Sequence, residues 1–265
     1  MRMQKLWGMV MTKLLASLIL VLFLWPCYAS AITAEEVARL TFERSEGSDS
    51  AAEAQMILIN SKGEKRVRRL RIYTRDDGKF RYTLIRFLAP KDIAGTGFLS
   101  KANLKTGEEE QFLYLPALKR TRRIAGSFRF HRFVNSDFTY EDLERHHPSR
   151  YHHELLGEEE VDGTLCYVLK SWPKKKKDSA YSYWIRWITK DGFLPIKEDF
   201  YDKKGRLWKK FEAVKWGKVD GYWAILHWKC TDLKKNHSSH LIIEDLHFDV
   251  GLDPKMFTRR YLERW

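Results

Sequence analysis

The chain has 265 residues, with 48 lysines and arginines against 35 aspartates and glutamates, which gives a formal net charge of +13. This length supports one sizeable domain or two small ones. Beyond residue 31 no apolar run is long enough to cross a membrane as a helix, because a span needs roughly 20 apolar residues. A protein with several membrane-spanning helices is therefore excluded.

Residues 1–31 are predicted to be a secretory signal sequence. Its three parts occur in order, as a basic start (Arg2, Lys5 and Lys13), an apolar run (14–25) and a pattern of small residues (29–31). The apolar run is too short to serve as a membrane anchor. We expect cleavage before Ile32 and export to the periplasm, which leaves residues 32–265 as the mature chain.

The mature chain remains basic. The signal contains three basic residues and no acidic ones, so its removal leaves a net charge of +10. Basic proteins often bind nucleic acid, but an exported protein rarely meets any, so we expect no nucleic-acid partner. Anionic lipid head groups or an acidic partner protein are the expected counter-charges. The alternative is that the charge only keeps an aromatic-rich protein soluble.

The mature chain is predicted to begin with a helix and then to change to strand periodicity. Val37, Leu40 and Thr41 share one face of a helix over residues 33–42, and a polar linker follows at 46–50. From there, alternating side chains predict strands at 54–59, 67–74, 80–88, 98–102, 111–115, 119–124, 151–156, 165–172, 181–188, 194–201, 206–216, 222–233 and 239–248.

Turn signals separate these strands at regular intervals. Residues 76–78, Asp-Asp-Gly, predict a tight hairpin, and Asp-Gly at 191–192 marks a later turn. A short helix is expected at 139–143, because Thr139 and Asp142 have the spacing of a capping box. Many strands joined by short turns predict a meandering antiparallel sheet that curls into a barrel or half-barrel. We expect one domain over the mature chain.

Two cysteines, Cys166 and Cys230, follow the predicted signal. In an oxidising compartment they can form a disulfide that adds a few kcal/mol of stability. The alternative is two separate buried thiols, which behave as small hydrophobic side chains. The choice depends on strand register.

No catalytic or metal-binding motif is present in the sequence. The histidine pairs at 146–147 and 152–153 lack the spacing of a zinc site, and adjacent residues on a strand point to opposite faces. Gly95 and Gly97 are not followed by the third glycine and helix of a dinucleotide fingerprint. We therefore expect no catalytic residue, no metal, no cofactor and no enzymatic activity, with a histidine-based hydrolase as a minor hypothesis.

Three segments together resemble the periplasmic LolA-like family, which is named for outer-membrane lipoprotein sorting. They are APKDIAGTGFLS (89–100), FLYLPALKRTRRI (112–124) and NSDFTYEDL (135–143). The resemblance begins at about residue 50 and is to the branch that carries YLPALKR and SDFxYEDL motifs. It implies a mainly β fold, in which a curved antiparallel sheet forms an incomplete (half) barrel with a few short helices covering the mouth.

The resemblance also implies roles for particular side chains. An apolar cavity would bind acyl chains, and the aromatic side chains expected to line it are Phe98, Phe112, Tyr114, Tyr183 and Trp187. The basic side chains expected at the rim, facing lipid phosphates or a partner, are Arg120, Arg122 and Arg123. The side chains expected in a lid are Phe138, Tyr140 and Leu143.

The function implied is that of a periplasmic carrier, which binds lipoprotein or lipid acyl chains and moves them between the envelope membranes. An inner-membrane transporter and an outer-membrane acceptor are the expected protein partners. The alternative hypothesis is a non-enzymatic adaptor that docks on an inner-membrane exporter. The basic surface around 120–132 and the lysine run at 174–177 favour that alternative.

Overall fold

A computed structural model describes residues 32–264, so the predicted signal sequence at 1–31 lies outside the described residues. Residues 33–264 belong to a single compact unit. Within residues 32–264 no helix has both the length and the apolar character needed to span a bilayer.

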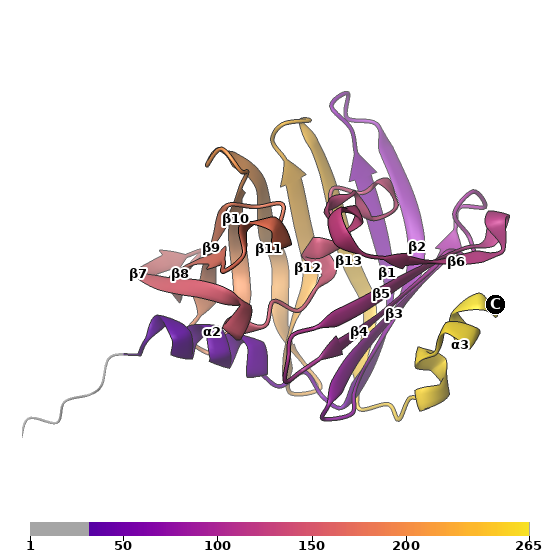
Figure 1. Cartoon of the computed structure of the whole chain (residues 1–265), viewed down its shortest axis with the longest axis horizontal. Helices are drawn as coiled ribbons and strands as arrows, with labels where there is room; N and C mark the ends of the chain where they lie inside the picture. The colour runs from indigo at the N-terminus through magenta and orange to yellow at the C-terminus, as the bar shows by residue number, and fades with distance from the viewer. Residues whose placement is uncertain (1–31, 265) are drawn as a thin grey trace, which may run out of the picture. The chain divides into compact units, whose positions relative to one another are not determined.

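The first helix of the described residues, α2 (Ala34–Glu43), confirms the helix predicted from periodicity. Thr33 caps it, because its hydroxyl accepts a hydrogen bond from the backbone nitrogen of Glu36 at 3.1 Å. Val37 and Thr41 are buried on the face that packs against β7 (Tyr151–Val161) and β8 (Thr164–Pro173). The helix therefore covers part of the sheet near one of its edges (Figure 1).

The remaining strands match the predicted series in number and order over the described residues. They are β1 (Asp49–Ile59), β2 (Lys65–Asp76), β3 (Phe80–Ala89), β4 (Gly97–Asn103), β5 (Glu109–Leu115), β6 (Arg120–Ile124), β9 (Tyr183–Thr189), β10 (Pro195–Tyr201), β11 (Leu207–Val219), β12 (Tyr222–Asp232) and β13 (His237–Phe248). The 3-10 helices are η1 (Pro116–Leu118), η2 (Gly126–Phe130), η3 (Phe133–Asn135), η4 (Glu141–Leu143), η5 (Pro148–Arg150), η6 (Lys176–Asp178) and η7 (Pro254–Phe257). A short helix, α3 (Arg259–Glu263), follows η7.

The largest differences are at two strand ends, each predicted five residues too short. β1 begins at Asp49 rather than at residue 54, because its small residues pair with β2 and β13 although they carry no apolar alternation. β7 continues to Val161 although Gly157 and the glutamates after it have the composition of a turn. Glu158 pairs with Tyr167 and Glu160 with Leu165, so these glutamates lie on an exposed edge strand where charge is tolerated.

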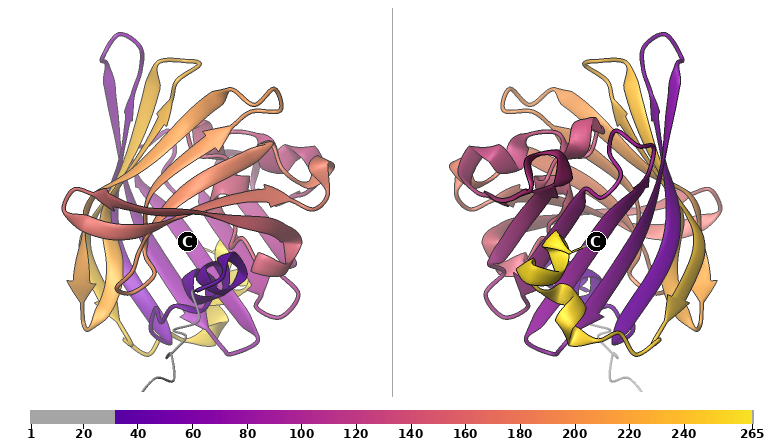
Figure 2. Two further views of the ribbon diagram at one scale, coloured as in Figure 1. Left: turned by 90° about the vertical axis from the view of Figure 1, so that its left-hand side faces the viewer. Right: turned by 90° about the vertical axis from the view of Figure 1, so that its right-hand side faces the viewer.

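All the described strands form one antiparallel sheet in the order β6-β5-β4-β3-β2-β1-β13-β12-β11-β10-β9-β8-β7. The first strand, β1, lies at the centre of the sheet; from there the chain meanders out to β6, crosses to the opposite edge at β7 and meanders back. The sheet is strongly curved, and its two edge strands do not pair with each other (Figure 2). The predicted incomplete barrel is thereby confirmed.

The sheet has apolar side chains on both faces. The larger cluster lies on the concave face and contains Met56, Phe87, Phe98 and Phe211 among others. On the other face a second cluster surrounds Trp187 at the β8–β10 end. A third cluster lies beneath the C-terminal segment, which covers the outer side of β3, β4 and β5 (Figure 2). The bulky residues on both faces explain why few strands show a purely polar side.

The two cysteines are free thiols in the described structure. Cys230 packs in the concave cluster and Cys166 in the cluster around Trp187, so the sheet separates them. The second of the two predicted alternatives, separate buried thiols, therefore holds.

Candidate functional site

Residues 125–150, here called the crossing segment, connect β6 at one edge of the sheet to β7 at the other. The segment contains η2, η3, η4 and η5 but, in the described structure, no named strand. It passes over the concave face, in front of the strands in Figure 1. It is the part of the molecule that determines what the hollow of the half-barrel can hold.

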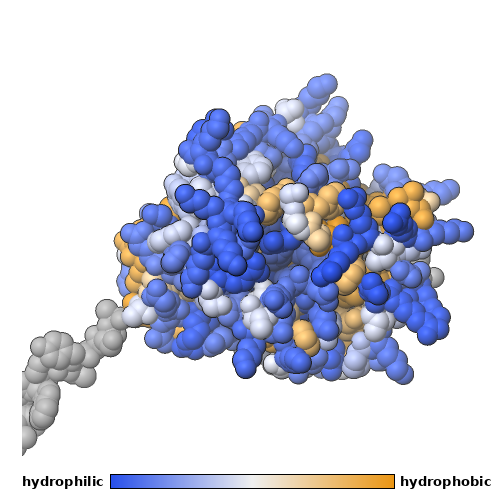
Figure 3. All heavy atoms as spheres, viewed as in Figure 1, coloured by the Kyte–Doolittle hydropathy of each residue, from blue (hydrophilic) through white to orange (hydrophobic). Residues whose placement is uncertain are grey.

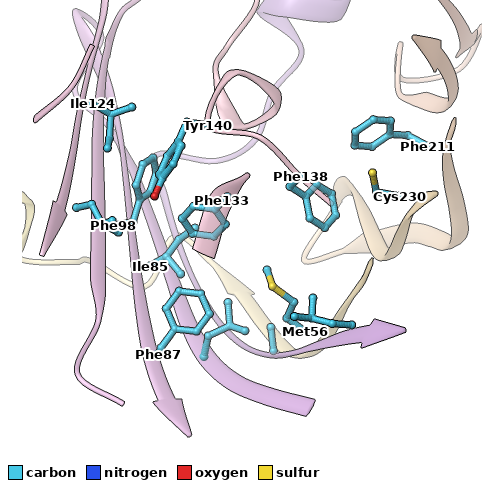
Figure 4. Packing of buried hydrophobic residues seen from close by; sticks show 14 of the residues in the cluster. Met56, Ile85, Phe87, Phe98, Ile124, Phe133, Phe138, Tyr140, Phe211 and Cys230 are labelled. Atoms are coloured by element: carbon cyan, nitrogen blue, oxygen red, sulfur yellow. The ribbon is translucent and has the colours of Figure 1, made fainter. Parts of the chain in front are cut away.

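The crossing segment inserts aromatic side chains into the concave face. The ring of Phe133 is fully buried and lies 5.3 Å from the ring of Phe98 and 5.5 Å from that of Tyr140, measured between centroids. Phe138 lies 5.7 Å from Phe211 at the other side of the hollow (Figure 4). Burying an aromatic or large aliphatic side chain stabilises by about 1.5–3 kcal/mol. The segment therefore occupies an apolar surface that would otherwise face water.

A first polar clasp holds this segment to β13 through Asp137. The hydroxyl of Ser239 donates to Oδ2 of Asp137 at 2.6 Å and accepts from the backbone nitrogen of Asp137 at 2.9 Å. Nδ1 of His237 lies 2.6 Å from the same carboxylate oxygen, and Arg132 forms an ion pair with the other oxygen. Asp137 is 1% exposed, so these partners satisfy a carboxylate that is out of contact with water.

A second clasp holds the segment to β11 through Asp142. Nζ of Lys209 lies 2.7 Å from Oδ2, and the hydroxyl of Tyr181 donates to Oδ1 at 2.7 Å. Asp142 also accepts from the backbone nitrogen of Thr139 at 2.7 Å, and its own backbone nitrogen donates to the Thr139 hydroxyl at 3.2 Å. The capping box predicted from the sequence is thereby confirmed, around a 3-10 turn (Glu141–Leu143).

Three glutamates near the second clasp have raised pKa values, because burial disfavours their charged forms. Burial raises the pKa of Glu141 to about 7, and the carboxylates of Asp142 and Glu144 add to the rise. Burial raises the pKa of Glu109 to about 7, and the negative charge of the nearby Glu144 adds to the rise. Burial also raises the pKa of Glu144, although its ion pair with Arg129 opposes that rise. Ionisation of Glu109 and Glu141 near neutral pH therefore places like charges where the crossing segment meets the sheet.

The hollow left between the crossing segment and the sheet has a volume of about 340 Å³. Its wall contains Phe200, Phe211 and Trp228 but also many ionisable side chains. Prominent among the latter is Glu46, whose pKa is lowered to about 2 because the guanidinium groups around it outweigh its burial. The hollow is therefore more polar than the predicted apolar cavity, because the aromatic side chains of the crossing segment fill the apolar part of the concave face.

An adjoining groove of about 800 Å³ opens between α2 and the end of the crossing segment. Phe42, Leu104, Pro148 and Tyr151 form its apolar wall, and charged side chains surround them. Phe42 and Arg145 belong to the walls of both spaces, so the groove leads towards the interior hollow. Its volume lies within the range of roughly 300–1,000 Å³ that is usual for ligand pockets.

The predicted lid residues all lie in the crossing segment. Phe138 and Tyr140 are buried against the concave face, and Leu143 is partly buried against the same cluster. Phe98, a predicted cavity residue, lies beneath them on β4. The four side chains belong to one cluster, in which the ring of Phe98 lies 6.1 Å from that of Tyr140 and Phe138 lies next to Phe211 on the other side of the hollow.

The other predicted lining residues lie elsewhere, and the register corrects their assignment. Leu99 of β4 pairs with Phe112 of β5, so Phe112 and Tyr114 lie on the outer face under the C-terminal segment, and Leu113 is the concave residue. On β9, Tyr183 stacks on Tyr201 with 4.2 Å between ring centroids.

Trp187 packs with Cys166 and Leu194 on that same outer side, whereas Trp184 of β9 belongs to the concave cluster. A shift of one residue along a strand exchanges the two faces.

The predicted rim residues Arg120, Arg122 and Arg123 are exposed on β6, the edge strand. The histidines are dispersed: His146 stacks on Trp184, and His153 contacts the hydroxyl of Ser171 at 2.9 Å. Within residues 32–264 no three histidine, cysteine or acidic side chains are grouped to hold a metal.

Sequence reasoning did not identify the partners of the two clasps, Lys209 and Ser239. Each lies on a strand far along the chain from the aspartate that it binds, so no local pattern indicates the contact. The one available signal was Lys209 itself, a lysine at an inward position of an alternating strand, where a buried cation requires a carboxylate.

The chain was compared with known families and structures. A family model described as an uncharacterized protein matches residues 79–264. A domain named for outer membrane lipoprotein sorting, from Vibrio parahaemolyticus, is 33% identical with a TM-score of 0.81, over 87% of this chain and 98% of that one. A DUF1329 family protein from Desulfovibrio piger is also 33% identical with a TM-score of 0.81, over 86% of this chain and 97% of that one.

A LolA superfamily protein from Nitrosomonas europaea shares the fold, at 20% identity and a TM-score of 0.67, over 87% of this chain and all of that one. Comparison with curated proteins gives no match.

Proposed function

The chain belongs to the LolA-like family of lipoprotein-sorting and DUF1329 proteins, and from this premise we propose that it is a periplasmic carrier for acyl chains of lipids or lipoproteins. The acyl chains bind on the concave face, where the crossing segment now lies. Binding involves no covalent chemistry, and each methylene group that leaves water contributes about 0.8 kcal/mol.

One observation carries this proposal. The concave face carries the largest cluster of buried apolar side chains, and a segment without strand pairing to the sheet covers it. Aromatic rings and two carboxylate clasps hold the segment in place, so it can leave without breaking the backbone ladder of the sheet. Cargo then takes the place of Phe133, Phe138 and Tyr140 over the concave strands (Figure 4).

The partners follow from this role. We propose an inner-membrane donor and an outer-membrane acceptor, because a carrier in the periplasm has to receive and release its cargo at membranes. Release needs an acceptor whose site is more apolar, or return of the crossing segment to the concave face. The adaptor hypothesis differs in requiring no bound acyl chain.

The experiment is photo-crosslinking with a fatty acid that carries a diazirine near the end of its chain. The expected adducts lie on concave residues, among them Met56, Phe87 and Phe98. Phe112 and Trp187, on the outer face, serve as internal controls and should remain unlabelled. Labelling only of the outer face would overturn the proposal, as would lipid-free protein in native mass spectrometry together with no labelling.

A further inference from the structure

The hairpin between β5 and β6 ends in an exposed apolar residue. Leu115 pairs with Arg120, so residues 116–119, here called the hairpin tip, form the connection. Leu118 is 67% exposed, more than any other large hydrophobic side chain in residues 32–264. The chain turns back into β6 at the next residue, Lys119, whose backbone φ is +47°. The tip therefore presents a leucine to the solvent at the end of a rigid hairpin.

Exposed basic side chains follow this leucine along β6. Lys119, Arg120, Arg122 and Arg123 are all exposed and follow it directly in the sequence. One nearby acidic partner is Glu110, which binds Arg123 at 3.0 Å. The guanidinium of Arg122 lies 3.8 Å from the centre of a neighbouring phenylalanine ring, which holds it at the surface.

The C-terminal helix α3 adds further positive charge beside the hairpin. It packs against β4, β5 and β6, and Glu263 accepts a hydrogen bond from the hydroxyl of Thr121 at 2.6 Å. Arg259, Arg260 and Arg264 are exposed beside that glutamate. Cations therefore outnumber carboxylates at this end of the molecule, which lies at the right in Figure 1. In Figure 3 hydrophobic residues are exposed among hydrophilic ones on that side.

We propose that the hairpin tip docks on an anionic lipid surface, with Leu118 inserted below the phosphates and the basic side chains against them. A single leucine in front of a group of cations matches a bilayer, in which hydrocarbon lies directly beneath negative charge. Apolar insertion and electrostatic attraction together give peripheral membrane binding. The surface lies outside the concave face, so this inference goes beyond the carrier function and stands without acyl-chain binding.

Docking through the hairpin also sets how far the crossing segment lies from the membrane. The crossing segment begins at residue 125, directly after β6. β6 has five residues, so roughly 17 Å of strand separates the hairpin tip from the start of the crossing segment, and a protein docked through the tip holds that start within this distance of the membrane. Cargo exchange at a bilayer would take place at this end of the half-barrel.

The test is flotation of the purified protein with vesicles of phosphatidylcholine alone and with an equal mixture of phosphatidylcholine and phosphatidylglycerol. Binding is expected only to the anionic vesicles. Lys119→Gln with Arg120→Gln should weaken it roughly twenty- to thirtyfold, since each basic residue near an anionic surface contributes about fivefold. The matched control is Lys175→Gln with Lys176→Gln, which removes the same charge from another exposed site.

A second pair of variants tests the apolar contact. Leu118→Ser should weaken binding to anionic vesicles about tenfold, as expected for exposing a leucine to water. Leu165→Ser changes a leucine that is 47% exposed on β8 and should leave binding unchanged. Both leucines are on the surface, so neither change should unfold the protein.

Three results would overturn the inference: no binding to either vesicle, an equal loss in the two charge variants, or no loss in Leu118→Ser. The first would leave an acidic protein as the partner of this surface. Fluorescent fatty-acid binding in the same variants separates this inference from the carrier function. If neither the wild type nor any variant binds the fatty acid, while vesicle binding still depends on the hairpin, the carrier proposal is rejected and the docking inference stands.

Discussion

Lys209 and Asp142 form a buried ion pair that joins the sheet to the crossing segment. Nζ of Lys209 lies 2.7 Å from Oδ2 of Asp142, and the two side chains are 2% and 1% exposed. Taking both charges out of water is costly, and the loss of one partner leaves the other charge buried alone. The pair therefore ties the position of the crossing segment to one place on β11.

Replacement of Lys209 by methionine should loosen the crossing segment. The change leaves the Asp142 carboxylate with two neutral donors, Tyr181 and the backbone of Thr139, and should cost about 3 kcal/mol. Hydrogen exchange at residues 125–150 should become faster while the strands stay protected. If the carrier proposal holds, a fluorescent fatty acid should also bind faster, because the open form is more populated.

Lys229→Met is the matched control for this prediction. Lys229 lies on the neighbouring strand β12 and binds Glu212 at 3.0 Å, but both side chains are about a third to a half exposed. Exposed pairs contribute about 0–1 kcal/mol. Equal exchange rates in the two variants would show that the ion pair does not hold the crossing segment.

Replacement of Ser239 by alanine should weaken the other clasp. The Ser239 hydroxyl both donates to and accepts from Asp137, so its loss leaves a buried backbone N–H without a partner. We expect a loss of about 1–3 kcal/mol in the free energy of unfolding. Chemical denaturation measures it, with Ser238→Ala, next to it on β13, as the control. A loss of the same size in both variants would argue against the clasp.

Alternation and turn composition were sufficient to predict the strand series and the open, curved sheet, because these features depend on local side-chain pattern. The same pattern does not determine which face is concave. Phe98 and Phe112 are both aromatic residues in apolar strands, yet they lie on opposite faces because Leu99, not Phe98, pairs with Phe112. That register depends on the exact length of the β4–β5 turn, and one residue more or less would reverse it.

The candidate site was likewise predictable only in part. Thr139 and Asp142 are three residues apart, so their capping interaction was predictable. The approach of Lys209 to Asp142 is a tertiary contact between residues 67 apart and has no local signature. Trp184 and Trp187 are three residues apart on one strand, so alternation places them on opposite faces, but it does not show that the face of Trp184 is the concave one.

Stability should depend on Glu141 in a defined pH window. Its pKa in the folded protein is about 7, raised first by burial and then by Asp142 and Glu144, against an ordinary value of 4.5. The protonated folded form is therefore favoured, so this contribution is fully present below about pH 4.5 and is lost as the pH rises through about 7. Glu141→Gln removes the titration and can still accept the hydrogen bond from Ala180.

The measurement is the difference in unfolding free energy between wild type and Glu141→Gln from about pH 4.5 to about pH 8. Relative to the variant, wild type should lose at most about 3 kcal/mol over this range. Other titrating groups are common to both proteins and largely cancel in the difference. Glu154→Gln on the exposed edge strand β7 is the control, and a constant difference for Glu141→Gln would contradict the buried, ionisable state of that side chain.

Replacement of Gly97 by alanine should release the C-terminal helix from the outer face. A Cβ at this position would lie 2.7 Å from Leu262 and 2.8 Å from the guanidinium of Arg86, which holds the backbone carbonyls of the last helix. We expect a loss of roughly 1–3 kcal/mol from overpacking, and proteolytic trimming after about residue 250. Gly217→Ala is the control, because a Cβ there meets nothing within 4 Å. Trimming at the same rate in both variants would show that the close packing at Gly97 does not fix the helix.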